Sequence, residues 1–167
     1  MTPLAIRATL VAPDGAPREP RFRGGETMTL EDVLDTFERD ATAHMTGGPA
    51  LEADLRQLES AIGHPLPGPL RTFLSRLGPG LFYQGHEIFG PLRVMIHDIE
   101  LVPSLASMLA RLKEQHLPEG LIPFHRGNGV VHLVDLRGPQ PGRVVSLPYG
   151  SNYSDLTEFL KAVVLQH

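Results

Sequence analysis

Histidines and carboxylates are the residues of this sequence best suited to metal or acid–base chemistry, because it has eight His and 19 Asp plus Glu but no Cys. Zinc sites use recurring spacings, such as two histidines four residues apart on one helix face. No two histidines here follow such a spacing. His125 and His132 flank a glycine-bearing turn and would approach each other across a hairpin, but two neutral imidazoles do not complete a metal site. We therefore predict no metal ion and no cofactor.

Covalent or acid–base catalysis is not indicated either. The sequence has no Cys nucleophile, no Gly-x-Ser-x-Gly elbow and no Ser-x-x-Lys motif. The glycine-rich stretch 126–129 is predicted to be a turn, since no helix follows it to hold a phosphate. Asp135 could act as a base or bond the turn around Gly138, and no second catalytic group pairs with it. We predict that the chain is not an enzyme; the enzymatic alternative needs a cleft gathering His125, His132 and Asp135.

Composition and charge exclude several other classes. A hydrophobic fraction of 41% and a charged fraction of 20% are typical of a globular protein. The formal net charge of −4 argues against a general nucleic-acid binder. No apolar run approaches the roughly 20 residues that span a bilayer, and the N-terminus lacks the pattern of a secretory signal. We expect a soluble, cytoplasmic protein that binds neither membrane nor nucleic acid directly.

The acidic residues are concentrated in one part of the chain. Residues 26–59 hold nine acids against Arg39 and Arg56, a net charge of −7. Glu31, Asp35 and Glu38 have the i, i+4, i+7 spacing that places them on one helix face. This segment is either a pair of solvated helix faces or an acidic patch that steers a basic partner. For the second reading, these three acids are our candidate partner-binding residues.

A second candidate patch lies near the C-terminus. Tyr149, Asn152 and Tyr153 belong to a short stretch rich in Tyr, Ser, Gly and Asn, a composition typical of binding loops. Tyr combines an apolar ring with a polar tip and is favoured at interfaces. The alternative is an ordinary loop that leads into the last helix.

The elements that must position these residues follow from hydrophobic periodicity and from Gly and Pro boundaries. Helices are predicted over residues 30–45, 51–62 and 70–77, then from a Ser104 cap until Pro118 ends the helix, and finally after Ser154 or Asp155. Strands are predicted over residues 4–11, 80–83, 86–89, 92–96, 121–124, 130–136 and 143–147. The short loops between the later strands favour antiparallel pairing. The pattern predicts an α+β fold with a central, mostly antiparallel sheet flanked by helices.

Three blocks of the sequence, taken together, resemble the SMI1/KNR4 (SUKH) superfamily. The first runs from Leu55 to Leu77, where a helix ends in Gly, a Leu-Pro pair follows, and a short helix carries a Phe-Leu pair. The second is the Gly-His-Glu-Ile-Phe-Gly stretch 85–90. The third joins residues 117–124 to the turn 127–129 and the strand 134–136. The turn and the strand after it are less acidic and less aromatic here than is common in the family.

The resemblance implies a compact α+β domain that acts through its surface and has no catalytic centre. It divides the chain into residues 1–48, an N-terminal extension outside the common core, and residues 49–167, an SMI1/KNR4-like domain. The strand and the helix of the extension are predicted from the hydrophobic pattern alone, and we expect the extension to pack on the core. Many bacterial members resemble immunity proteins that neutralise toxins, often nucleases. Our leading hypothesis is therefore an immunity protein that covers the active site of a cognate toxin, with a basic nuclease toxin as the favoured partner. The alternative is an intracellular regulatory or scaffold module without a toxin partner; the oligomeric state is left open.

Overall fold

The computed structural model describes residues 27–147 and 150–166, and the strand predicted over residues 4–11 lies outside them. The helices are α1 (Leu30–Arg39), α2 (Glu52–Ile62), α3 (Gly68–Arg76), α4 (Leu105–Lys113) and α5 (Leu156–Phe159), with a 3₁₀ turn at Ala41–Ala43 and a π-helical turn at Leu160–Val164. The strands are β1 (His44–Thr46), β2 (Gly80–Phe82), β3 (His86–Ile88), β4 (Val94–Ile96), β5 (Ile99–Val102), β6 (Leu121–Gly127), β7 (Val130–Asp135), β8 (Arg143–Leu147) and β9 (Asn152–Tyr153).

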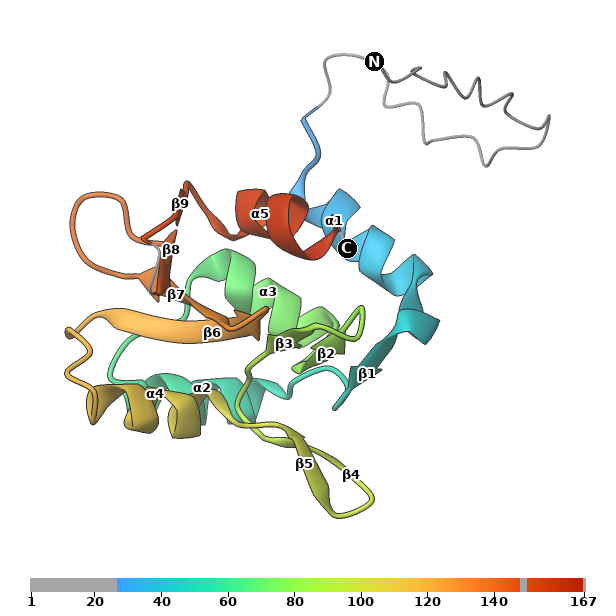
Figure 1. The fold of residues 1–167 in the computed structure, drawn as a ribbon, viewed down its shortest axis with the longest axis horizontal. Coiled ribbons are helices and arrows are strands. Elements are labelled where there is room, and N and C mark those ends of the chain that lie inside the picture. The colour runs from blue at the N-terminus through green and yellow to red at the C-terminus, as the bar shows by residue number, and fades with distance from the viewer. Residues whose placement is uncertain (1–26, 148–149, 167) are drawn as a thin grey trace, which may run out of the picture.

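Seven of these strands form one antiparallel sheet in the order β1-β2-β3-β6-β7-β8-β9, as Figure 1 shows. Helix α3 packs against both α1 and α5, and α2 packs against α4. Strand β6 is buried along nearly its whole length because it lies inside the sheet and α4 packs on it. The predicted α+β class with a mostly antiparallel sheet is confirmed.

Local sequence signals explain several element ends. Thr29 and Asp32 form a capping box at the start of α1, each side chain bonding the backbone of the other residue. Gly63 ends α2 in the left-handed conformation, with φ of 74°. The Ser104 hydroxyl accepts a hydrogen bond from the Ser107 amide and begins α4, as predicted.

Two predicted helices are longer than those observed. The helix predicted over residues 30–45 ends at Arg39, and its last part instead forms the 3₁₀ turn and β1, which pairs with β2. Tyr83 donates a hydrogen bond to the Asp40 carboxylate at 2.7 Å and holds the chain where it leaves the helix. The helix after Ser104 ends at Lys113, before Pro118, and His116 follows with a φ of 63°.

A cluster of aromatic rings joins α1 to the rest of the molecule. Phe37 of α1 meets Phe73 of α3 at 5.6 Å and Phe82 of β2 at 5.3 Å, both edge to face. All three rings are buried and belong to the single core of the described residues. Edge-to-face pairs add to the stabilisation that burial itself provides. The described part of the predicted extension, residues 27–48, therefore contributes a helix to this core and an edge strand to the sheet.

Candidate functional site

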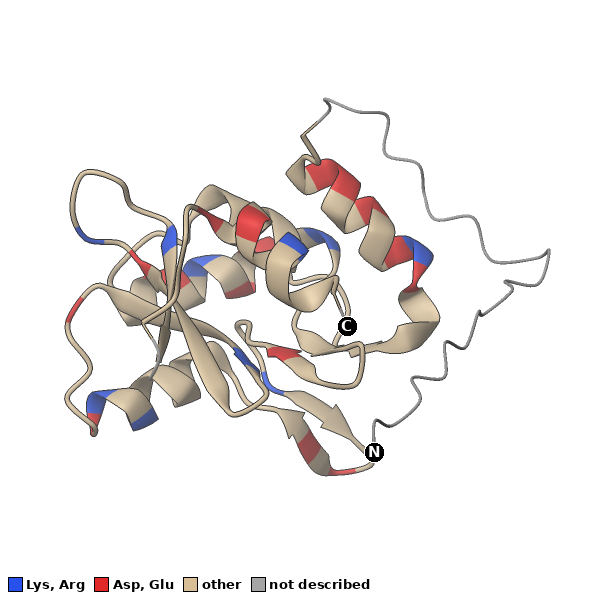
Figure 2. Cartoon of the chain, turned by 45° about the horizontal axis from the view of Figure 1, so that its top comes forward, with Lys and Arg blue, Asp and Glu red and all other residues tan. Residues whose placement is uncertain are grey.

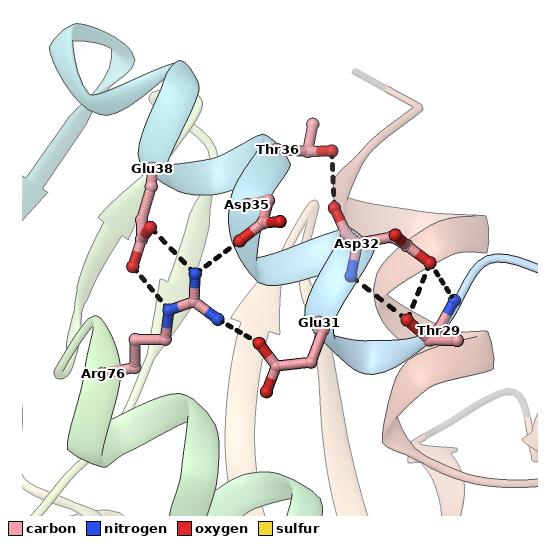
Figure 3. Close-up of polar contacts among 7 residues, drawn as sticks. All are labelled: Thr29, Glu31, Asp32, Asp35, Thr36, Glu38 and Arg76. Atoms are coloured by element: carbon pink, nitrogen blue, oxygen red, sulfur yellow. Dashed lines mark hydrogen bonds and ion pairs between the residues drawn. The ribbon is translucent and has the colours of Figure 1, made fainter.

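The three acids predicted to share a face of α1 do so, and they converge on one cation. Glu31, Asp35 and Glu38 all form ion pairs with Arg76, which reaches them from α3 (Figure 3). The Glu38 carboxylate accepts from Arg76 Nε at 2.6 Å. Arg76 lies 38 to 45 residues away along the chain, so helical spacing could not identify it.

This cluster carries more negative than positive charge. Three carboxylates surround one guanidinium, which leaves a net charge of −2, and the acidic side chains are between 44% and 70% exposed. Hydrogen bonding by Arg76 holds the pKa of the Glu38 carboxyl below its usual value. Figure 2 shows the acidic residues following one another along α1. We name Glu31, Asp35 and Glu38 the acidic face of α1.

The second candidate patch, Tyr149, Asn152 and Tyr153, is only partly exposed in the described residues. Asn152 is exposed and donates a side-chain hydrogen bond to the Gly150 carbonyl at 3.1 Å. Tyr153 is half-buried, with its ring 5.5 Å from that of Phe159, so part of it packs on the core. Tyr149 lies outside the described residues. The strand that carries Asn152 and Tyr153 is separated from α1 by α5, so the two candidate patches do not form one surface (Figures 1 and 2).

Three buried histidines form a hydrogen-bonded chain inside the fold. His125 Nδ1 lies 3.0 Å from His132 Nδ1 across the β6–β7 pair, which confirms the predicted approach across the hairpin. His125 Nε2 lies 3.0 Å from Nδ1 of His86 on β3, a third member that the sequence spacing did not indicate. A register shift between Pro123 and His125 accompanies this arrangement, and the rings of both Phe124 and His125 contact Phe159.

The chemistry of this histidine chain is that of a structural network. A neutral imidazole has one N–H and one acceptor nitrogen, so His125 donates to one neighbour and accepts from the other. Burial lowers the pKa of His125 to about 2 and that of His132 to about 4, with the neighbouring imidazoles adding to the effect. His125 turns different nitrogens to its two neighbours, so one ion cannot use both contacts. Within the described residues, no group of three or more His, Cys, Asp or Glu is arranged to bind a metal.

Asp135 does not join these histidines. Its buried carboxylate accepts hydrogen bonds from the Arg137 amide at 2.9 Å and from the Arg137 and Arg143 guanidiniums. These bonds, those of Arg137 above all, hold the pKa of Asp135 below its usual value. The hollow beside β7, about 420 Å³, is lined by Val134 and Leu136 and by none of His125, His132 and Asp135. The cleft that an enzyme using these three residues would need is not formed there.

The sequence reasoning missed one further surface feature. The segment predicted as a single strand over residues 92–96 forms a hairpin with β5, which projects from the body of the fold (Figure 1). His97 and Asp98 at its tip both have positive φ, of 48° and 63°, as in a type I′ turn. Large apolar side chains, Met95 and Ile99, are exposed here, and the apolar run in the sequence does not indicate that exposure.

These observations define an α+β domain with an acidic face on α1, an exposed β4–β5 hairpin and a buried chain of three histidines. Comparison with family models gives a more specific result, since the model of the SMI1 / KNR4 family (SUKH-1) matches residues 49–162. The chain belongs to this family, as the three sequence blocks predicted. Membership of the family supports a protein-binding module.

The fold also matches a solved structure. A protein from Pseudomonas syringae pv. tomato superposes with a TM-score of 0.61 and 16% sequence identity, covering 82% of this chain and 99% of that chain. At this identity the similarity shows the fold alone. No curated protein gives a significant match. None of the helices in the described ranges has the length and apolar character that crossing a bilayer requires.

Proposed function

We propose that this protein is a cytoplasmic immunity protein that neutralises a cognate toxin by covering its active site. Family membership supports the binding of a protein partner. The observation that carries the proposal further is the acidic face of α1, where three exposed carboxylates share a single guanidinium. A surface with such an excess of negative charge attracts a positively charged partner.

The charge of this face suits a nuclease toxin in particular. A nuclease must bind the phosphate backbone, so it presents Lys and Arg around its active site. An acidic surface that approaches this groove is drawn in by long-range attraction, and a contact of about 800 Å² per partner is enough to exclude the nucleic acid. No reacting group on the inhibitor is needed for this mechanism.

A regulatory or scaffold module is the second candidate function, because the same family membership supports any protein partner. The two functions differ in what the partner does alone. A toxin partner arrests growth when expressed by itself, and co-expression of this chain restores growth. A scaffold partner produces no such arrest, and that result would contradict the immunity function while leaving the binding function intact.

The role of the acidic face is tested by association kinetics with the protein that co-purifies with the tagged chain, after that protein has been purified. The double variant E31Q/D35N should slow association by roughly 3- to 10-fold at low salt, with a smaller effect at high salt. The matched control E114Q/E119Q removes the same charge from the C-cap of α4 and from the loop between α4 and β6, where both acids are exposed. Equal slowing by both variants would reduce the effect to net charge and contradict a role for the face.

Arg76 supplies a test of opposite sign. The variant R76Q leaves all three carboxylates in place and makes the acidic face more negative by one charge. We expect it to accelerate association at low salt, provided that circular dichroism shows the fold retained. Slower association by folded R76Q would mean that the geometry that Arg76 imposes matters more than the charge.

Asn152 and Tyr153, with Tyr149, remain the second candidate patch for the partner. The variant N152A removes an exposed side chain whose amide donates to the Gly150 carbonyl within its own turn. Faster dissociation of N152A from the same purified partner would place this loop in the contact.

A further inference from the structure

The β4–β5 hairpin and the adjoining segments around Leu51 and Leu92 expose large apolar side chains. Leu51, Leu92, Met95 and Ile99 are between 41% and 71% exposed, and we call these four residues the hairpin surface. Met95 pairs with Glu100 and Ile99 with Ile96, so Met95 and Ile99 lie on opposite faces of the hairpin and the surface extends around it. Leu92 stands between two hollows of about 250 and 180 Å³, which share Asp54 and Leu92 in their walls. Leu51 and Leu92 both line the larger hollow, and neighbouring exposed apolar residues of this kind mark an interaction site, whereas single exposed apolar residues need no explanation.

The hairpin surface is held in place by the core. Val94 of β4 and Val102 of β5 pair with each other and are both buried, so the base of the hairpin is fixed. The Leu105 amide also donates to the Gly90 carbonyl at 2.9 Å, which ties the segment before the hairpin to the start of α4. A fixed surface loses little conformational entropy when a partner binds.

Charge decides what kind of molecule can cover this surface. Arg56 pairs with Glu52, and Arg93 lies 4.0 Å from Glu100, so these charges offset one another. Asp54 at the hollows and Asp98 at the hairpin tip are in no ion pair with the described residues, which leaves the surroundings at −2. A second copy bound through this surface by two-fold symmetry would bring acids against acids. A basic partner would meet complementary charge.

We propose that the hairpin surface is the apolar anchor for the basic partner of the preceding section. The partner places an apolar side chain in the hollows beside Leu92 and sets Lys or Arg side chains against Asp54 and Asp98. The inference rests on the proposed function and adds to it the place where the complex is held together. The acidic face of α1 then governs encounter, and the hairpin surface governs retention, because exposed charges act mainly on association and desolvated apolar contacts on dissociation.

The test separates these two kinetic roles with the purified partner protein. The variant L92S/I99S should accelerate dissociation by at least 10-fold and change the association rate by less than about 2-fold. Leu147→Ser is the matched control, since Leu147 is also apolar and 40% exposed but lies on β8. Both variants change exposed side chains, and thermal melts should match the wild type. Equal acceleration by L147S would assign the anchor to the loop that follows β8 and overturn the inference.

Protection of single cysteines locates the contact independently, because the chain has no native Cys. Maleimide labelling of L92C and I99C should slow by at least 10-fold when the purified partner is bound, while Q115C at the far end of α4 should label at an unchanged rate. Unchanged labelling of L92C and I99C in the complex would overturn the inference.

Other occupants give other results. A wild-type dimer in light scattering that becomes monomeric in L92S/I99S would show that a second copy covers the surface. Faster labelling of L92C after deletion of residues 1–26 would show that the N-terminal segment covers it. Either result overturns the inference. Failure of the wild type to bind any partner would overturn the proposed function as well, whereas binding unaffected by L92S/I99S would overturn the inference alone.

Discussion

The buried histidine chain predicts that this protein loses stability in mild acid. In the folded chain, burial keeps His125 and His132 neutral, with pKa values of about 2 and about 4. In the unfolded chain their imidazoles take up protons near the ordinary histidine pKa of 6.5. Between these values the unfolded chain binds more protons than the folded chain, so the free energy of unfolding must fall as the pH falls below 6.5.

The size of the effect follows from the number of histidines involved. Each imidazole that is protonated only in the unfolded chain removes about 1.4 kcal/mol per pH unit. From pH 7.5 to pH 5.5, His125 and His132 together remove about 2.7 kcal/mol from the free energy of unfolding. The carboxylates titrate mainly below this interval, so the histidines dominate the change.

Urea unfolding followed by circular dichroism at pH 7.5, 6.5 and 5.5 measures this change directly. In H125Q, whose amide can still donate and accept, the loss over the interval should fall to about 1.4 kcal/mol. The control H116N removes an exposed imidazole that water solvates in both states, and it should leave the wild-type loss unaltered. A wild-type loss below about 1 kcal/mol, or an equal loss in H125Q, would refute the argument that these histidines stay neutral in the fold.

Two further predictions concern stability. Thr29→Ala removes the hydroxyl of the capping box and should lower the free energy of unfolding by about 1 kcal/mol in urea melts. Thr36→Ala on the same helix is the control and should change the free energy of unfolding far less. Equal effects of the two variants would contradict a capping role for Thr29. Gly78→Ala should lower the free energy of unfolding by at least about 3 kcal/mol, since φ is +80° and the new Cβ would overlap the backbone of Gly48. Gly138→Ala should lower it by about 1 kcal/mol, because φ is +76° but the space around the new Cβ is open. Similar losses of stability for the two variants in thermal melts would show that the overlap is relieved.

Much of the fold could be predicted because its boundaries are encoded locally. The predicted hairpin over 80–83 and 86–89 appears as β2 and β3, since two aromatic segments flank a short turn. The strand at Ile99–Val102 was missed because the turn before it is formed by His97 and Asp98, which lack the Asn-Gly or Asp-Gly signature of such turns. The helix predicted over residues 30–45 was too long because pairing of β1 with β2 is a tertiary effect.

The candidate site was predictable only where its members are neighbours in sequence. Helical spacing placed Glu31, Asp35 and Glu38 on one face, and strand pairing brought His125 to His132, as the structure confirms. Arg76 comes from a different helix, and contacts between elements leave no local signal. The exposure of the hairpin surface was hidden for the same reason, since an apolar residue in a strand is normally expected to face the core.

The structure also changes how the charge of residues 26–59 should be understood. Their net charge of −7 leaves out two arginines that lie outside the segment but form ion pairs with its acids. Arg71 pairs with Glu52 and Glu59, and Arg76 pairs with the acidic face of α1. Adding these two cations leaves −5, so intramolecular pairing offsets less than a third of the excess. Arg76 fixes the direction of three carboxylates while leaving them exposed, and the proposed function relies on this arrangement, because a preformed surface loses little conformational entropy on binding.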